Sequence, residues 1–257
     1  MKLLLVPAST GFTWVRLGIQ TFKRQPLALA GLFFMFMAWL SLASMIPFIG
    51  LPIAMTLLPA ATLGLMVATK EAAAGTFPMP RLLISGFRAG TEKAQRLLAL
   101  GALYALGFMC AMGAAYLVDG GDFARMYLGG TAPSEEVINS GDFMSAMSVF
   151  IGLHIPLSLV FWHAPALVYW HDMPALKSMF FSMVACFRNF WALALFAVSW
   201  MGVMILGMLT LTSIATMLDS ANLAAALAFP LLLLMAAMFF TSIYFTFRDS
   251  FEPTETH

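Results

Sequence analysis

The sequence predicts an all-α integral membrane protein in which six transmembrane helices form three helical hairpins. Two observations lead to this fold class. Hydrophobic residues make up 61% of the 257 residues and charged residues only 10%, and a water-soluble chain of this length cannot bury so much apolar surface. The charged residues also gather in basic stretches ahead of alternate apolar segments, so we expect a cytoplasmic amphipathic interfacial helix before each hairpin.

Six windows contain no Asp, Glu, Lys or Arg and are each long enough for a helix to cross roughly 30 Å of hydrocarbon. They cover residues 27–46, 53–69, 97–118, 143–170, 191–211 and 223–246. Between the first two windows lie Pro47, Gly50 and Pro52. These residues predict a tight turn there, because a continuing helix would not tolerate them.

Basic residues fall almost entirely on one side of these windows. Lys and Arg in short loops are retained in the cytoplasm, so the N-terminus, the loops after the second and fourth windows and the C-terminus are predicted to be cytoplasmic. The loop 119–142 is acidic apart from Arg125 and is predicted to lie on the outer side. We therefore expect a multi-pass protein with both termini in the cytoplasm.

The chain also has the pattern of a threefold internal repeat. An offset of 94 residues superposes Pro80 on Pro174 and Gln95 on Asn189 without a gap, and Gln25 takes the corresponding place in a looser first unit. Each returning window ends in a basic residue or histidine followed by an acid. We predict one polytopic membrane domain, 1–257, with repeat units of about 10–71, 79–172 and 173–249.

The basic stretches that precede the hairpins are predicted to lie in the cytoplasmic interface. On a helical wheel of residues 10–24, aromatic and aliphatic side chains gather on one half and basic and polar side chains on the other. Cations at this depth attract anionic lipid headgroups by about 1 kcal/mol each. The alternative is that these are ordinary connecting helices that carry topology signals. The candidate lipid or partner contacts are Arg16, Lys23, Arg24, Arg88, Lys93, Arg96, Lys177 and Arg188.

Ionisable groups at membrane depth are functional candidates because burying them is costly. Two histidines of the fourth window, His154 and His163, meet this condition, but they are nine residues apart and face opposite sides of a straight helix. Pro156 and Pro165 each free a carbonyl one turn back and bend the helix. The segment around His163 is therefore a candidate kink beside a polar cavity. The alternative is a neutral histidine hydrogen-bonded within the bundle.

The sequence predicts no catalytic residue, no cofactor and no metal site. It contains no Gly-rich phosphate loop and no nucleophile with a recognisable neighbourhood. Cys110 and Cys186 fall at different depths, so we expect no disulfide. The 21 methionines include pairs at helical spacing, but methionine commonly fills apolar helix interfaces, which we prefer to a copper site. A net charge of +1 argues against a nucleic-acid partner.

Several short motifs carry a resemblance to a known family. They are Val6-Pro7-Ala8, Trp14-Val15-Arg16, Arg24-Gln25-Pro26-Leu27-Ala28 and Thr62-Leu63-Gly64-Leu65-Met66. The chain resembles, over nearly its whole length, an uncharacterised family of bacterial, mostly proteobacterial, predicted inner-membrane proteins. Its three-unit layout is more distantly similar to the membrane domain attached to some glycerophosphodiester phosphodiesterases. The resemblance implies six spans in a bacterial inner (plasma) membrane and assigns no site.

Two functional hypotheses follow. The leading one is a non-enzymatic membrane protein that organises lipid or partner proteins at the cytoplasmic leaflet, because the chain has basic amphipathic stretches and no charged residue within its apolar windows. The alternative is a carrier or channel for a small hydrophobic or neutral solute, with the histidines and prolines of the fourth window along the path. That alternative requires a continuous polar cavity at mid-membrane depth. The expected partners are membrane lipids and other membrane proteins.

Overall fold

The computed structural model describes residues 2–130 and 133–252 and shows an all-α integral membrane protein. Within these residues, six helical segments are long and apolar enough to cross a membrane. They are Pro26–Ser44 (α2), Gly50–Ala73 (α3), Thr91–Asp119 (α5), Gly141–Trp162 with Ala164–His171 (α8 and α9), Phe190–Met217 (α11) and Ala221–Ser250 (α12). Each coincides with one of the predicted windows, so the prediction of six membrane helices is confirmed.

The first hairpin, α2 and α3, turns within a shorter segment than the prolines predict. The turn occupies residues 45–49, where Phe48 has a φ of 65°. Gly50 and Pro52 instead lie in the first turn of α3. A proline is tolerated there because the N–H that it lacks would have no acceptor within the helix.

Short interfacial elements precede the three hairpins. Thr10–Arg24 forms α1 and Ala175–Arg188 forms α10. The middle stretch is a 3-10 helix, Pro80–Ile84 (η1), followed by a single turn of α-helix, Ser85–Arg88 (α4). This stretch breaks at Gly90, whose φ of 107° is a left-handed conformation that glycine adopts without strain. The break redirects the chain into α5.

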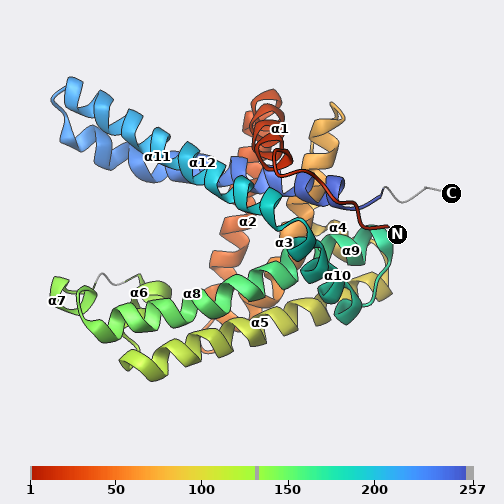
Figure 1. The fold of residues 1–257 in the computed structure, drawn as a ribbon, viewed down its shortest axis with the longest axis horizontal. Coiled ribbons are helices and arrows are strands. Elements are labelled where there is room, and N and C mark those ends of the chain that lie inside the picture. The colour runs from red at the N-terminus through yellow and green to blue at the C-terminus, as the bar shows by residue number, and fades with distance from the viewer. Residues whose placement is uncertain (1, 131–132, 253–257) are drawn as a thin grey trace.

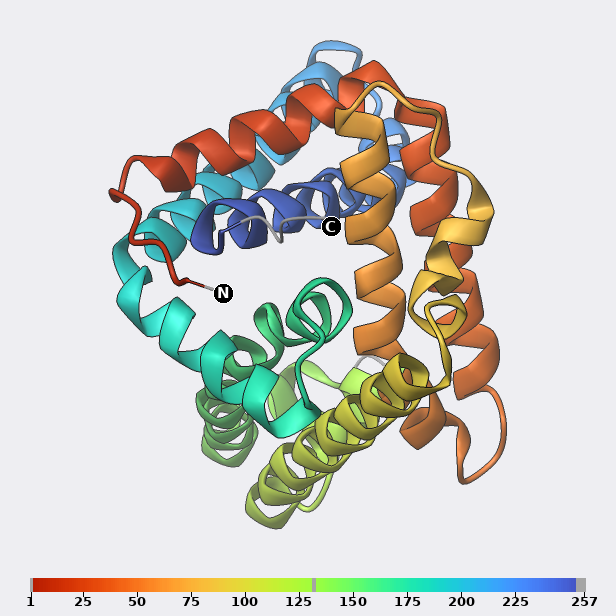
Figure 2. The same ribbon diagram turned by 90° about the vertical axis from the view of Figure 1, so that its right-hand side faces the viewer.

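Each interfacial element packs on the helix that returns from the preceding hairpin. η1 lies against α3, α10 lies against α8 and α9, and α1 closes the circle by lying against α11 and α12. Figure 2 views this end and shows α1 (red) and α10 (teal) on two sides of the molecule, with the last turns of α12 (blue) between them. We call this the basic end; it comprises α1, η1, α4, α10, the segment 2–9 and residues 250–252.

The second and third hairpins diverge on the opposite side. Figure 1 shows α5 with α8 and α11 with α12 pointing away from each other on the side that is far from the termini. Two short helices, Asp122–Gly129 (α6) and Glu135–Ile138 (α7), connect α5 to α8 there. We call this the acidic end; it comprises α6, α7 and the turns 45–49 and 218–220.

Three tryptophans join other helices to one face of α12 near the basic end. The indole N–H groups of Trp14, Trp162 and Trp200 donate to Asp249 Oδ2 (2.9 Å), Thr246 Oγ1 (3.0 Å) and Ser242 Oγ (3.1 Å), respectively. The acceptors recur every three or four residues and therefore lie on one side of the helix. These bonds tie α12 to α1, α8 and α11.

The N-terminal segment pairs antiparallel with the residues that follow α12. The buried Asn189, between α10 and α11, holds this junction. Its Nδ2 donates to the carbonyl of Leu4 (3.0 Å) and to Oγ of Ser250 (3.4 Å), and its Oδ1 accepts from the N–H of Val6 (3.0 Å). One amide thus connects three separate parts of the chain at the basic end.

Candidate functional sites

Two of the predicted lipid contacts have partners within the protein. Lys93 and Arg96, near the start of α5, both lie within ion-pair distance of Asp172, in the turn between α9 and α10 (3.7 and 3.5 Å). Nζ of Lys93 also donates to the carbonyl of Tyr169 (3.0 Å), and Arg96 pairs with Glu92. These contacts fasten α5 to the returning span of its own hairpin.

The remaining predicted contacts take part in no ion pair within residues 2–130 and 133–252. All of them are exposed, and they lie on α1, α4 and α10: Arg16, Lys23, Arg24, Arg88, Lys177 and Arg188. Arg81 of η1, which is not one of the predicted contacts, is also exposed and takes part in no ion pair within the described residues. In the sequence, Arg81 can be recognised as a candidate because it directly follows Pro80, at the start of the second interfacial stretch.

Packing fixes α1 with its basic half outward. Trp14, Val15 and Phe22 are buried against neighbouring helices, and Phe12 is exposed. A Cβ added at Gly18 would lie 2.4 Å from Cβ of Ser242, so α1 and α12 approach each other closely at this glycine. The aromatic half of α1 therefore packs mainly on protein, while its cations face away from it.

A pocket of about 230 Å³ lies between η1, α4 and α9. Arg81, Arg88, Ser85 and Tyr169 contribute to its lining. The hydroxyl of Ser85 donates to the carbonyl of Leu82 (2.7 Å), as is usual in a tight helical turn. The two arginine side chains beside this pocket can donate hydrogen bonds to the oxygens of a phosphate group.

The fourth span is divided at His163, where α8 and α9 meet. Pro165, in the first turn of α9, cannot donate to a carbonyl one turn back. The N–H of His163 donates to Oγ of Ser182 (2.9 Å), which in turn donates to the carbonyl of Leu159 (2.9 Å). In an unbroken helix the N–H of His163 would donate directly to the carbonyl of Leu159. Here the Ser182 hydroxyl of α10 bridges these two groups. The sequence carries no signal for this role of Ser182.

The two histidines of the fourth span lie in different surroundings. His163 is 1% exposed, and its ring packs edge-on against Phe251, with 5.5 Å between ring centroids. The ring of His154 instead stacks on Phe150, with 5.1 Å between centroids and 14° between planes. Nδ1 of each histidine is buried and has no hydrogen-bond partner among the described residues. The structure therefore does not bring the two together.

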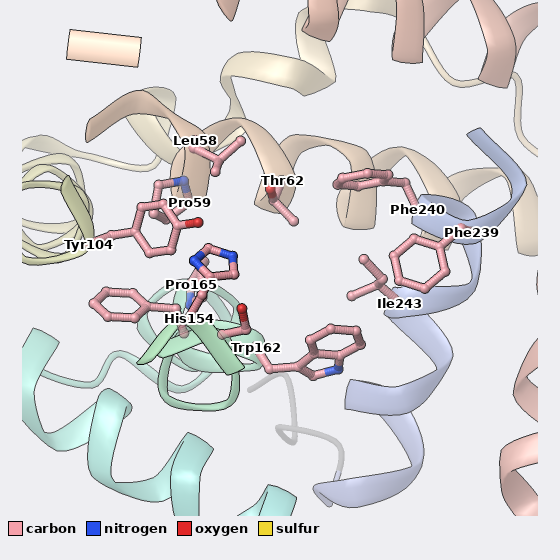
Figure 3. Close-up of a pocket in the computed structure, with 12 residues that line it drawn as sticks. Leu58, Pro59, Thr62, Tyr104, His154, Trp162, Pro165, Phe239, Phe240 and Ile243 are labelled. Atoms are coloured by element: carbon pink, nitrogen blue, oxygen red, sulfur yellow. The ribbon is translucent and has the colours of Figure 1, made fainter. Parts of the chain in front are cut away.

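A cavity of about 320 Å³ lies where the three hairpins meet (Figure 3). Among the predicted pore residues, His154 and Pro165 line it, whereas Pro156 and His163 do not. Its apolar lining includes Leu58, Pro59, Phe161, Phe239, Phe240 and Ile243, and no charged residue is part of the lining that the structure describes. Figure 3 shows the hydroxyl of Tyr104 and the ring of His154 pointing into the same space.

Two further polar side chains, those of Asp119 and Cys186, have structural roles. The carboxylate of Asp119 accepts from the N–H groups of Gly121 (2.8 Å) and Phe123 (2.6 Å) and so shapes the start of α6. On α10, burial raises the pKa of the Cys186 thiol to about 12, so the thiol stays protonated at neutral pH and is a packing group. No group of three or more His, Cys, Asp or Glu that could hold a metal occurs among the described residues.

A probable inner membrane protein of Burkholderia thailandensis is 34% identical to the chain over 258 residues, and the alignment covers 99% of this chain and 96% of the relative. The chain belongs to this family of probable inner membrane proteins. This family membership and the six apolar helices make it a multi-pass protein of the bacterial inner membrane. No protein-family model and no solved structure matches the chain. The more distant resemblance to membrane domains attached to phosphodiesterases remains a prediction.

Proposed function

We propose that this member of the family has no enzymatic activity and organises anionic lipid at the cytoplasmic leaflet of the inner membrane. The observation that carries the proposal is the set of seven exposed cations on α1, η1, α4 and α10 that have no ion-pair partner among the described residues. In this proposal both termini lie in the cytoplasm, because short basic segments are retained there.

The position of the cations supports binding to a membrane surface. α1, η1 with α4, and α10 lie on different sides of the basic end, as Figure 2 shows, so their cations surround the helix ends. Each cation near an anionic surface contributes about 1 kcal/mol, and this contribution is absent at a neutral lipid surface. Exposed cations arranged around the basic end therefore favour anionic lipid over neutral lipid. The pocket lined by Arg81 and Arg88 is the place where one headgroup would be held most closely.

The rigidity of α1 also favours this role. A free amphipathic helix loses conformational entropy when it folds on a membrane. α1 is already folded, because Trp14 is hydrogen-bonded to Asp249 and Gly18 lies against Ser242. Its cations are therefore presented in a fixed arrangement before any lipid binds.

The opposite end has the charge that the proposed orientation requires. Acidic residues predominate at or next to the acidic end: Asp119, Asp122, Glu135, Glu136, Asp142 and Asp219. Arg125, the basic residue of this region, pairs with Asp122. A fluorescent protein that folds only in the cytoplasm, fused to the C-terminus, is expected to fluoresce. A dark fusion with normal membrane insertion would contradict the orientation.

Native mass spectrometry of the protein in nanodiscs of mixed anionic and neutral lipid tests the lipid role. We expect the wild-type protein to retain anionic lipid selectively, and the triple variant Arg16→Glu, Lys23→Glu, Arg24→Glu to lose most of this selectivity. Arg125→Glu is the matched control, since it reverses one charge at the acidic end and should change nothing. Equal retention of both lipids by the wild-type protein would sink the proposal. A retained protein of defined mass, lost in the triple variant, would replace lipid by a protein partner.

A carrier or channel for a small hydrophobic or neutral solute is the second candidate function. The central cavity is the observation that favours it, because His154 and Pro165 line a hollow at the level where the hairpins meet. Solute flux into vesicles distinguishes the two functions. Flux that is lost on substitution of His154 but kept in the triple variant of α1 would favour a carrier or channel over the lipid role.

A further inference from the structure

The central cavity suits a ligand of a different kind from anionic lipid. We propose that it binds one neutral amphiphile, an alcohol or carbonyl compound with an apolar body, whose polar group is held by Thr62, Tyr104, His154 and Ser158. This site does not depend on the proposed role of the cations at the basic end.

Four polar side chains of the cavity lining make no hydrogen bond to the described residues, unlike Trp162, whose indole N–H donates to Thr246. Nδ1 of His154 is buried and has no hydrogen-bond partner among the described residues. The hydroxyls of Thr62, Tyr104 and Ser158 line the open space of the cavity and make no side-chain hydrogen bond within the part of the chain that the structure describes. Polar groups in hydrocarbon are costly unless they are hydrogen-bonded. Four such groups from α3, α5 and α8 around one hollow indicate that a bound molecule supplies the missing partner.

Several threonines elsewhere in the spans are bonded within their own helix. Thr69, Thr210 and Thr241 each donate to the carbonyl four residues earlier in their own helix, at 2.7 to 2.8 Å. This bond is the ordinary way for a threonine to be satisfied in a membrane helix. Thr62 and Ser158 do not use this bond, and the hydroxyl of Tyr104 is too far from its own backbone to do so.

The lining determines the charge and size of the ligand. No charged residue lines the cavity within the described chain, and a charged group bound there would lack a counter-ion in a medium of low dielectric constant. The volume of about 320 Å³ suits a small ligand rather than a complete two-chain phospholipid. Aromatic side chains such as Phe161, Phe239 and Phe240 provide the surface for its apolar body.

The donor and acceptor groups determine the polar end of the ligand. A neutral imidazole offers one donor and one acceptor, and a hydroxyl offers both. An alcohol can satisfy either kind of partner, and a carbonyl can accept from the hydroxyls of Thr62, Tyr104 and Ser158. Both keep the ligand neutral, as the lining requires.

The second and third hairpins are joined on one side of the cavity and diverge on the other. Trp162, which lies toward the basic end of the cavity lining, is hydrogen-bonded to Thr246 and so joins the second hairpin to the third there. Toward the acidic end these hairpins diverge, as Figure 1 shows.

Photolabelling tests the site in the full-length protein reconstituted in vesicles of bacterial polar lipid. The probe is a long-chain alcohol that carries a diazirine in its chain, and labelled peptides are identified by mass spectrometry. We expect the label to concentrate on peptides of α8 and α12 that line the cavity. Excess decanol should displace it, and decyltrimethylammonium, which has the same chain and a positive charge, should not.

His154→Phe is the decisive variant. It keeps an aromatic ring to stack on Phe150 but removes both nitrogens, so the fold should persist while labelling of the cavity falls about fivefold or more. Thr210→Val is the control, because it removes a hydroxyl that is already bonded to the carbonyl of Leu206 on the exposed side of α11. Labelling should stay unchanged in this control and in the triple variant of α1.

Three results would overturn the inference. Labelling of His154→Phe at the wild-type level would show that the polar groups hold no ligand. Label spread evenly over the lipid-facing helices would show that the probe does not enter the cavity. Displacement by decyltrimethylammonium as effective as displacement by decanol would show that the site does not select a neutral molecule.

Discussion

The basic end and the acidic end of the molecule are held together in different ways. At the basic end, interfacial elements bridge neighbouring hairpins, three tryptophans donate to α12, and Asn189 joins the N-terminal segment to the end of the chain. At the acidic end, the second and third hairpins diverge, and turns and the short helices α6 and α7 connect the spans within each hairpin.

This difference shows where the stability of such a bundle arises. Lipid tails are as apolar as the helix surfaces, so association of spans gains little from the hydrophobic effect. Hydrogen bonds and close approaches at small residues have to supply the attraction. Hydrogen bonds between separate elements gather at the basic end, whereas close approaches at glycines occur both there, at Gly18, and in mid-span, at Gly101 beside Thr56. Three substitutions test this view, in order of decreasing effect on stability.

Asn189→Ala should be the most damaging of the three. It removes three hydrogen bonds of a buried amide and leaves the carbonyl of Leu4 and the N–H of Val6 without this partner. We expect a loss of about 2–4 kcal/mol, measured by thermal unfolding in detergent micelles. Gln95→Ala is the matched control, because Gln95 is the equivalent position in the predicted repeat but is exposed on α5. An equal loss in both variants would show that the junction of the chain ends is not what stabilises the basic end.

Gly18→Ala should destabilise the protein less than Asn189→Ala does. Compared with a glycine toward the acidic end, it should show clearly that the two ends differ. Its added methyl group would lie 2.4 Å from Cβ of Ser242, so α1 and α12 have to move apart. The expected loss is about 1–3 kcal/mol in the same unfolding experiment. Gly113→Ala, toward the acidic end of α5, meets no atom within 4 Å and should be neutral or stabilising by up to about 1 kcal/mol, because alanine favours the helix. Destabilisation of equal size at both glycines would break the comparison.

Asp172→Asn should have the smallest effect. Asp172 pairs with Lys93 and Arg96, but its side chain is 69% exposed, so water and salt screen these ion pairs. Asparagine tolerates the left-handed backbone of this residue, whose φ is 57°. We expect a loss of less than about 1 kcal/mol at low salt that disappears at high salt. A larger, salt-independent loss would mean that these ion pairs are a principal fastening of α5.

Much of the fold is predictable because each span is specified by its own segment. A charge-free apolar window of sufficient length forms a membrane helix whatever its neighbours are, and all six windows do so. Element boundaries that depend on local backbone chemistry are harder to predict from the sequence. Pro52 lies in the first turn of α3 and not in the preceding turn, and Gly90 ends the second interfacial stretch and separates α4 from α5.

The candidate sites are predictable only in part because they depend on contacts between distant segments. The sequence identifies Lys93 and Arg96 as cations near the interface, but Asp172, which pairs with both, comes from another part of the chain. The sequence also identifies two histidines of the fourth span. It does not reveal that His154 lines the cavity whereas His163 packs against Phe251.

The sequence by itself determined the membrane class, the six helices and the separation of basic from acidic segments. These properties follow from composition, from the length of apolar windows and from charge, each of which a single segment carries alone. Tertiary structure decided which cations are paired, how Ser182 enters the break at His163, and that Nδ1 of His154 is buried without a partner among the described residues. Those outcomes require groups from separate helices to meet within hydrogen-bond distance, and only the packing of the three hairpins brings them there.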